Sequence, residues 1–310
     1  MASFHTELSR EGPGLLLRDI LSGTDEQVQA VIEAISEIDA DIIALQSIDY
    51  DLEGRALQAL GQDALNYKYY YSAPPNAGRA TELDLDGDGR RGGPGDAQGY
   101  GTFYGQSGLA ILSRFPIETS AVQNFTGLLW KDLPDALLPM TQKGPYPSAE
   151  AQNHQRLASK NALAVPIRHP NFGVITILTF HATPPVFDGP EDRNGRRNHD
   201  EVAFWLHFLN GAIGIAPRGK FILAGNANLD PKRGEGRKQA LHNLLSHPLL
   251  QDPLKYQTTV HWKKLGDMRV DYLLPSRDWR VVRAQVAALH PAASRHRLIW
   301  VDLEHERLQP

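Results

Sequence analysis

Cysteine is absent from this sequence of 310 residues. Disulfide bonds, thiolate nucleophiles and zinc sites with thiolate ligands are therefore excluded, and any metal ion must be bound by oxygen or imidazole ligands. Long hydrophobic runs are also absent, which argues against a membrane-spanning helix. There is no excess of basic residues, because the formal net charge is −4. A small anionic partner fits this charge better than nucleic acid, which is possible but not favoured.

The amino terminus has no basic segment followed by a hydrophobic one. We expect a soluble protein, extracytoplasmic rather than cytoplasmic, with its leader outside this sequence. The composition, with 41% hydrophobic and 22% charged residues, is that of an ordinary globular protein. No linker or internal repeat divides the chain, so we expect residues 1–310 to form a single domain and the protein to be a monomer.

The hydrophobic pattern predicts a helix after Gly23, followed by a buried strand. Hydrophobic residues recur at helical spacing in residues 28–38, and Thr24 and Gln27 are placed as a capping box. Residues 42–48 form a short hydrophobic run typical of a strand buried on both faces. Further strands are predicted at residues 108–113, 162–167, 174–181, 220–227, 269–274, 279–287 and 296–303, and helices at 200–209 and 237–246. Many strands with few helices between the later ones indicate two sheets packed face to face, with helices outside.

Residues 72–105 are rich in glycine, proline, aspartate and arginine, and they predict a surface excursion longer than most connections. Within it, Asp84, Asp86 and Asp88 occupy positions one, three and five of a pattern with glycine at position six, as in the first half of a calcium-binding loop. Position twelve is glycine instead of glutamate, but Asp96 follows and could close the site. A bound structural calcium ion and a merely solvated acidic turn are the two interpretations.

Residues 221–231 predict a buried strand that ends in a polar turn. Residues two apart on a strand face the same side, so Asn226 and Asn228 are predicted to leave the sheet together. They would do so at the carboxyl end of the strand, where open α/β sheets bind their ligands. An asparagine-rich turn without function is the alternative interpretation.

Seven segments follow one another in an order that resembles a known family. They are Phe4-His5-Thr6-Glu7 and residues 41–46, 108–117, 179–184, 225–228, 269–272 and 294–298. Each is a weak signal alone, but in this order they make the chain resemble the endonuclease/exonuclease/phosphatase superfamily, which includes pancreatic deoxyribonuclease. The resemblance implies an α/β fold, a four-layer α/β/β/α sandwich with two packed mixed sheets, as in deoxyribonuclease I.

The resemblance also implies a phosphoesterase, in which water attacks a phosphodiester or phosphomonoester in line and a divalent cation (Mg or Mn) neutralises the phosphoryl oxygens. His181 and His296 match the two histidines that act on the phosphate in this family. Asp271 matches the aspartate that orients the last histidine, and Asn228 matches the asparagine that positions the phosphate or the nucleophile. A small phosphate-bearing substrate is favoured.

The metal-binding positions depart from the pattern of the family. Ser47 stands where the family has a glutamate, Asn226 and Arg295 stand where it has aspartates, and His5 stands where it has an asparagine. Three carboxylates are thus replaced by a hydroxyl, an amide and a guanidinium. Magnesium prefers carboxylate and water oxygens, so the usual site cannot form unchanged.

Two interpretations follow from these replacements. Glu7 and Asp49, which lies two residues past Ser47 on the same predicted strand face, could hold a weaker or shifted Mg or Mn ion. Alternatively, the guanidinium of Arg295, beside the Asn226 amide, binds phosphate without an ion. Hydrolysis would then be slow or absent, and the protein would be a pseudoenzyme that binds a phosphate-bearing ligand.

Residues 188–199 are dense in arginine and turn formers, which predicts a loop that overhangs the cleft. In this loop Arg193 and Arg196 could bind substrate phosphate. The alternative is a charged loop that is simply solvated.

Overall fold

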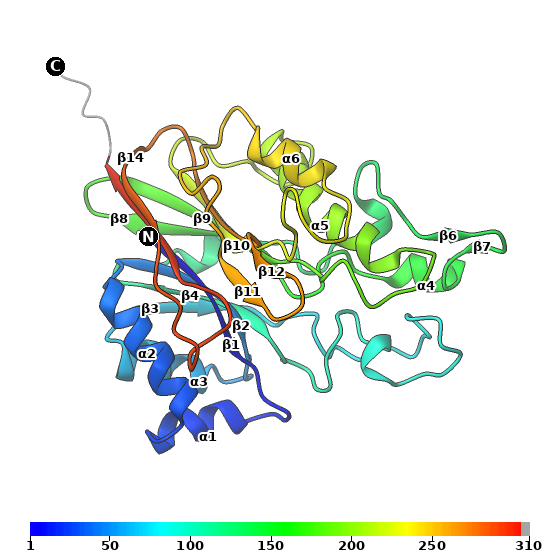
Figure 1. Ribbon diagram of the computed structural model, residues 1–310, viewed down its shortest axis with the longest axis horizontal. Coiled ribbons are helices and arrows are strands. Elements are labelled where there is room, and N and C mark those ends of the chain that lie inside the picture. Colours follow the sequence, from blue (N-terminus) through cyan, green and yellow to red (C-terminus); the bar gives the residue numbers. More distant parts are fainter. Residues whose placement is uncertain (305–310) are drawn as a thin grey trace.

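The computed structural model describes residues 1–304 and contains two β-sheets packed face to face, with helices on both outer sides (Figure 1). This arrangement confirms the predicted four-layer α/β/β/α sandwich with two mixed sheets. The first sheet has six strands, in the order β14 (Arg280–Val286), β15 (Ile299–Glu304), β1 (Ala2–Leu8), β2 (Ile42–Ile48), β4 (Gly108–Ser113) and β3 (Tyr69–Ser72).

The second sheet has five strands, and two short hairpins lie outside the sheets. Its order is β13 (Asp271–Pro275), β10 (Phe221–Asn226), β9 (Gly173–His181), β8 (Ala162–His169) and β5 (Gln123–Asn124). The hairpins are β6 (Met140–Thr141) with β7 (Gly144–Pro145), and β11 (Val260–Trp262) with β12 (Gly266–Met268). Strands β1 and β2, and strands β9 and β10, run parallel, so their carboxyl ends meet at one end of each sheet.

Helices cover the outer face of each sheet. Those on the first sheet are α1 (Leu15–Ser22), α2 (Glu26–Ile38) and α3 (Arg55–Gln58), which continues as a π-helical turn over Ala59–Ala64. Those on the second sheet are α5 (Arg193–Leu209) and α6 (Gln239–Leu245). Helix α4 (Ala149–His154) lies beside the β6–β7 hairpin, and 3-10 turns occur at Pro94–Asp96, Thr119–Ala121 and Trp130–Asp132.

The central hydrophobic layer explains why hydrophobic and polar residues do not alternate along strand β2. Ala44 faces the second sheet, where it packs in one cluster with Val165 and Ile177, whereas Ile43 and Leu45 pack against the helices of the first sheet. A strand buried on both faces needs hydrophobic residues at successive positions. The continuous hydrophobic run at residues 42–48 therefore predicted this strand correctly.

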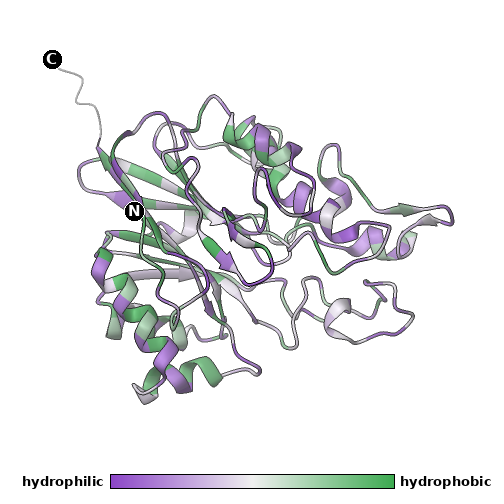
Figure 2. Cartoon of the chain, viewed as in Figure 1, coloured by the Kyte–Doolittle hydropathy of each residue, from purple (hydrophilic) through white to green (hydrophobic). Residues whose placement is uncertain are grey.

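The predicted capping box places the N-cap of α2 at Thr24, but the observed N-cap is one residue later. Asp25 is the N-cap, and its side chain accepts a hydrogen bond from the Val28 amide at 2.8 Å, so the predicted box between Thr24 and Gln27 is wrong. Gln27 instead donates to the backbone oxygen of Glu7 at 3.1 Å. Hydrophobic and hydrophilic residues alternate around α2, as its packing on the sheet requires (Figure 2).

The segment between β3 and β4 extends away from the sandwich, as predicted (Figure 1), but it is not simply solvated. Ala77 and Leu85 are completely buried. Asn76 is also completely buried, and its amide donates to the backbone oxygens of Thr126 at 2.6 Å and Ala158 at 2.8 Å. These hydrogen bonds tie the polar excursion to the second sheet, which the composition alone did not indicate.

No helix within residues 1–304 is long and hydrophobic enough to cross a membrane.

Close packing at Gly225 predicts a strong effect of one added methyl group. A Cβ atom at this position would lie 2.4 Å from the Phe180 backbone oxygen and 2.6 Å from its ring. Gly225→Ala is therefore expected to lower the free energy of unfolding by about 1–3 kcal/mol, measured by urea denaturation. Gly127→Ala is the control, because no atom lies within 4 Å of its added Cβ. Equal stabilities of the two variants would contradict the prediction.

Candidate functional site

Three histidines from distant parts of the chain meet at the end of the sandwich where β1, β9 and β10 finish. His5 lies on β1 of the first sheet, His181 ends β9 of the second sheet, and His296 lies just before β15. The ring centroids of His5 and His296 are 4.0 Å apart with the rings stacked, and those of His5 and His181 are 4.8 Å apart in an edge contact. The structure thus brings the predicted pair His181 and His296 together, with His5 between them.

His5 is buried next to two other imidazoles, and this environment keeps it neutral. Its exposed fraction is 7%. Burial, together with the positive charge of a protonated His296, lowers the pKa of His5 to about 3. The sequence pointed to this residue only as a replacement for an asparagine. Its role at the centre of the cluster was missed, although its place in the first motif was an available signal.

His296 is held by a buried carboxylate. Its Nδ1 lies 2.8 Å from Oδ2 of Asp271, so Nδ1 carries the proton and Nε2 is left free. Burial acts to raise the pKa of Asp271, but the charge and hydrogen bond of His296 outweigh it, and the net pKa lies below the usual range. An ionised carboxylate orients the imidazole and stabilises its cationic form, as the resemblance implied for this pair.

Asn226 supports Asp271 from behind and is not exposed to the cleft. Its Nδ2 donates to Oδ1 of Asp271 at 2.7 Å, and its Oδ1 accepts from the Asn228 amide at 2.9 Å. The residue is completely buried. Contact of Asn226 with phosphate stays a prediction that its burial does not favour, and its observed contact is with Asp271.

Asn228 does reach the cleft, because the chain turns sharply after β10. Its backbone φ is +48°, in the left-handed region. Its Nδ2 donates to the Ala182 backbone oxygen at 2.8 Å and lies 3.2 Å from Nε2 of His181. An amide nitrogen can only donate, so Nε2 of His181 accepts and its proton is on Nδ1. Burial is the main cause that holds the pKa of His181 well below its usual value, and the positive charge of Lys160 adds to it.

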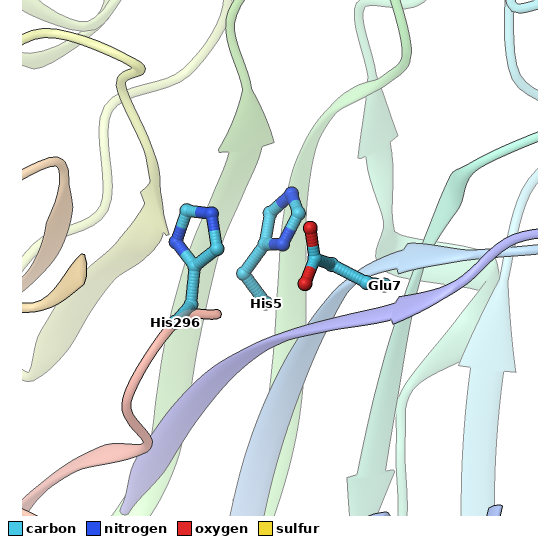
Figure 3. A group of neighbouring side chains, drawn as sticks. All are labelled: His5, Glu7 and His296. Atoms are coloured by element: carbon cyan, nitrogen blue, oxygen red, sulfur yellow. The ribbon is translucent and has the colours of Figure 1, made fainter. Parts of the chain in front are cut away.

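Glu7 and Arg295 form an ion pair at the edge of the cluster. One carboxylate oxygen of Glu7 accepts from Nε and Nη2 of Arg295, the former at 2.8 Å. The other accepts from the backbone amide of Arg295 at 2.8 Å and from the Ser294 hydroxyl at 3.0 Å. Burial opposes ionisation, but the hydrogen bonds from Arg295 prevail and lower the pKa of Glu7 to about 2. Figure 3 shows the Glu7 carboxylate beside His5, with His296 on the far side of that ring.

Ser47 and Asp49 do not lie on one strand face, which corrects the prediction from alternation. The pairing of β2 with β4 is irregular between Gln46 and Ile48, and Ser47 has a φ of +58°. Its hydroxyl bonds to that of Ser107 at 2.9 Å. Because the irregularity breaks the period of two, the alternation rule fails here.

Both oxygens of the Asp49 carboxylate accept backbone hydrogen bonds. One accepts from the Arg10 amide at 2.7 Å and the other from the Ser107 amide at 2.9 Å. Burial raises the pKa of Asp49 despite these contacts. The carboxylate therefore joins two loops, and it is not within ligand distance of the cluster of His5, Glu7 and His296.

The divalent cation implied by the family does not fit these residues. A Mg or Mn site needs several carboxylate, carbonyl or water oxygens in octahedral geometry. Glu7 supplies the only carboxylate of the cluster with His5 and His296, and both of its oxygens accept hydrogen bonds from Arg295. Asp49, the second predicted ligand, is engaged elsewhere. The predicted site of Glu7 with Asp49 is thus not assembled.

Lys160 is a cationic side chain that the sequence analysis missed. Strands β8 and β9 are antiparallel, with Ala162 paired to Phe180, so Lys160, two residues before β8, lies close to His181. Its Nζ donates to the Tyr100 backbone oxygen at 3.2 Å. Burial lowers the pKa of Lys160 to about 8, which still leaves it mostly protonated at neutral pH. The only available signal was its position just before a predicted strand.

Arg193 and Arg196 lie in helix α5, which begins at Arg193, so the predicted loop over residues 188–199 is wrong in its second half. Arg193 donates to the side chain of Gln155 at 2.8 Å, and Arg196 donates to the Glu191 backbone oxygen at 3.1 Å. Neither has a hydrogen bond with the histidine cluster. Phosphate binding by these two arginines is a prediction that their observed contacts do not favour.

Asp84, Asp86 and Asp88 are brought together as the calcium interpretation requires. One carboxylate oxygen of each lies within 4.8 Å of the others. Asp96 closes the loop differently from the prediction, since its oxygens accept from the backbone amides of Leu85 and Gly93, each at 2.9 Å. Burial and the neighbouring carboxylates raise the pKa of Asp86.

If calcium binds this loop, removing it will destabilise the protein. Calcium at about 100 times its dissociation constant would add about 2.7 kcal/mol, so a chelator should lower the melting temperature measured by calorimetry. Asp84→Ala combined with Asp86→Ala should abolish the response. Glu53→Ala with Asp63→Ala, two exposed acids outside the loop, should retain it. If neither calcium nor chelator changes the melting temperature of the wild-type protein, the solvated-turn interpretation is supported.

The buried neutral histidines predict a loss of stability in mild acid. The unfolded chain takes up a proton at His5 as pH falls through 6.5, whereas the folded chain does so only near pH 3. The free energy of unfolding should therefore fall between pH 6.5 and 4.5 by about 1.4 kcal/mol per pH unit for each such histidine. His181 contributes in the same direction, while Glu7, with its pKa lowered from 4.5 to about 2, matters only below pH 4.5.

His5→Gln should reduce this slope, as measured by urea denaturation at several pH values. His154→Gln is the control, because His154 is exposed on α4. An unchanged slope in His5→Gln would show that His5 titrates normally in the folded protein.

Comparison with known proteins agrees with this architecture. Residues 19–296 match the profile of the Endonuclease/Exonuclease/phosphatase family. No curated protein matches the sequence at a significant level.

Several solved structures share the fold at low sequence identity. A family protein from Beutenbergia cavernae DSM 12333 superposes with a TM-score of 0.61 and 15% identity, covering 98% of this chain and 70% of that chain. One from Leptotrichia buccalis C-1013-b gives 0.56 and 17%, covering 98% of each. A mannosyl-6-phosphatase from Bacteroides thetaiotaomicron VPI-5482 gives 0.51 and 15%, also covering 98% of each. Because the family profile spans most of the chain, the protein belongs to the Endonuclease/Exonuclease/phosphatase family.

Proposed function

We propose that the protein is a phosphoesterase that hydrolyses a small phosphate-bearing substrate at the histidine cluster. The observation that carries this proposal is the buried pair of Asp271 and His296, joined at 2.8 Å, next to His181 and Asn228. A histidine with a fixed tautomer and a free Nε2 can take a proton from water or give one to a leaving group. Membership in a family of phosphoesterases supports this assignment.

The remaining histidines would contact the phosphoryl group. Nδ1 of His5 and Nδ1 of His181 are buried and have no hydrogen-bond partner within residues 1–304. Buried polar atoms are normally satisfied, so these atoms support the presence of a ligand that hydrogen-bonds to them. Asn228 fixes the Nδ1–H tautomer of His181, which makes that nitrogen a donor toward phosphoryl oxygen.

In the proposed reaction, water attacks phosphorus in line with the ester oxygen. His296 accepts a proton from the water at Nε2 while Asp271 stabilises the imidazolium. The ester oxygen leaves with the bonding electron pair and takes a proton from solvent, and His296 later releases its proton to solvent. The products are an alcohol and phosphate from a phosphomonoester, or an alcohol and a phosphomonoester from a phosphodiester.

A small substrate agrees with the charge of the chain and with two structural neighbours. One neighbour is the mannosyl-6-phosphatase, and another is the human Nocturnin catalytic domain with a bound sulfate anion, at a TM-score of 0.51 and 17% identity. The formal net charge of −4 does not favour a long nucleic acid. These similarities support a phosphate-sized anion site without specifying the rest of the substrate.

A second candidate function is binding of a phosphate-bearing ligand without hydrolysis. The ion pair between Glu7 and Arg295 favours it, because the pair engages the one carboxylate that is grouped with His5 and His296 as a possible ligand set. A family member that lacks its usual ion would bind an anion and turn it over slowly or not at all.

Hydrolysis of p-nitrophenyl phosphate and bis(p-nitrophenyl) phosphate separates the two candidates. Purified protein is assayed with magnesium, manganese or calcium, and with a chelator. We expect turnover of at least one substrate, and a fall in kcat of about 10²–10⁴-fold in His296→Ala and His181→Ala. His154→Ala, on exposed α4, should keep wild-type activity. A folded protein that shows no turnover under any condition would favour the binding protein.

A further inference from the structure

Two cationic side chains lie near the histidine cluster, and one of them stands where the resemblance implies a metal ligand. Arg295 occupies a position expected to hold an aspartate, and its guanidinium is paired with Glu7. Lys160 precedes β8, which pairs with β9 so that Ala162 lies opposite Phe180, and this register places Lys160 close to His181. A phosphoryl dianion bound at the cluster would lie near the positive charge of both groups.

The two carboxylates that contact the histidines or share a ligand set with them are engaged by the protein itself. Asp271 accepts from His296 and from Asn226. Glu7 accepts four hydrogen bonds, three of them from Arg295. No oxygen of either carboxylate is left without a hydrogen-bond donor, so a hard cation would have to break an existing contact to gain a ligand.

A metal ion that prefers imidazole ligands, such as zinc, is compatible with one distance. The possible ligand atoms of His5, Glu7 and His296 lie within 4.8 Å of one another. Their orientation argues against it. The rings of His5 and His296 are stacked with only 26° between their planes. Imidazole binds a metal through a lone pair that lies in the ring plane, about 2.0–2.1 Å from the ion for zinc. Two nearly parallel planes do not meet within that distance, so one ion cannot be bound by both rings without rotation.

Arg295 keeps a donor for substrate while it holds Glu7. Its Nε and Nη2 are directed to Glu7, and its Nη1 has no hydrogen-bond partner within residues 1–304. The side chain is 67% exposed, in contrast to 19% for Glu7. The guanidinium thus lies at the mouth of the cleft, where its partner limits its movement and one edge can meet an incoming phosphate.

We infer that this cleft binds and hydrolyses phosphate esters without a divalent cation, with Arg295 and Lys160 as the positive charges on the phosphoryl oxygens. This inference rests on the proposed phosphoesterase function. Water is the nucleophile, its proton passes to His296, the ester oxygen leaves as an alcohol, and no co-reactant is needed. The ion pair of Arg295 with Glu7 takes the place of a metal and its carboxylate ligand.

The first test measures hydrolysis by metal-stripped protein in the presence of chelator. We expect an unchanged rate compared with untreated protein and no gain on adding magnesium or manganese. Arg295→Ala and Lys160→Ala should each lower kcat/KM by about 10- to 100-fold, the value of a hydrogen bond to a charged group. Arg295→Lys should retain part of the activity because it keeps the charge. Turnover that disappears with chelator and returns with an ion would overturn the inference and leave the phosphoesterase function intact.

Matched variants separate charge at the cleft from general effects on the surface. Arg168→Ala removes an arginine that is 63% exposed and paired with Glu118, as Arg295 is with Glu7. Lys143→Ala removes an exposed lysine in the β6–β7 turn. Both should behave like wild type. If Arg295→Ala does not fold, Lys160→Ala and Arg295→Lys test the same charges.

A second test does not need activity. Inorganic phosphate is titrated into the protein in chelator by calorimetry, with an expected affinity that falls about 10- to 100-fold in Arg295→Ala and in Lys160→Ala. Absence of turnover with phosphate binding intact would reject the phosphoesterase function but retain the ion-free anion site. Absence of phosphate binding, or binding that requires magnesium or manganese, would overturn the inference.

A third test looks for the metal directly. Equilibrium dialysis against zinc, manganese and magnesium uses the Asp84→Ala plus Asp86→Ala background, which removes the acidic loop as a competing site. We expect no stoichiometric retention of any ion. One equivalent that is lost again on adding His5→Gln would establish a site at His5, Glu7 and His296 and would disprove the inference.

Discussion

The face-to-face packing of the two sheets is the constraint on which the candidate site depends. The hydrophobic layer between them includes Ala44 and Ile111 of the first sheet, and Val165 and Ile177 of the second. This layer holds the end of β1 against the ends of β9 and β10, so that His5 of one sheet touches His181 of the other. The same packing removes water from the imidazoles and makes their protonation unfavourable.

Two separate hydrogen-bond chains then determine the electrostatics of the cleft. One runs from Asn226 through Asp271 to His296, and it sets both the tautomer and the orientation of that histidine. The other joins Glu7 to Arg295 at the mouth. In each chain, side chains of the protein hydrogen-bond to a carboxylate, Asp271 in the first and Glu7 in the second. Little unpaired negative charge is therefore left to attract a cation. Such a cleft agrees with the proposed binding of a phosphate anion.

Backbone strain accompanies this arrangement. Glu7, Ser47 and Asn228 all have positive φ angles, between +48° and +58°. Such conformations cost about 1–3 kcal/mol for residues other than glycine and cluster at functional sites. Here they end regular strand alternation near the cleft, which is why Ser47 and Asp49 diverge and why Asn228 reaches His181 while Asn226 stays buried. Local turn geometry of this kind is invisible to a rule of period two.

The sequence by itself determined the main strands and the two packed sheets, because hydrophobic periodicity is a property of neighbouring residues. The pairing of His296 with Asp271 was implied by the resemblance of the ordered motifs to a known family. The sequence did not determine that Asn226 would be buried, that α5 would begin at Arg193, or that Lys160 would lie beside His181. Only the tertiary structure decided that Arg295 pairs with Glu7 and that His5 stacks on His296. These contacts join residues almost 300 positions apart, and their geometry follows from sheet packing and strand irregularities, which no local pattern encodes.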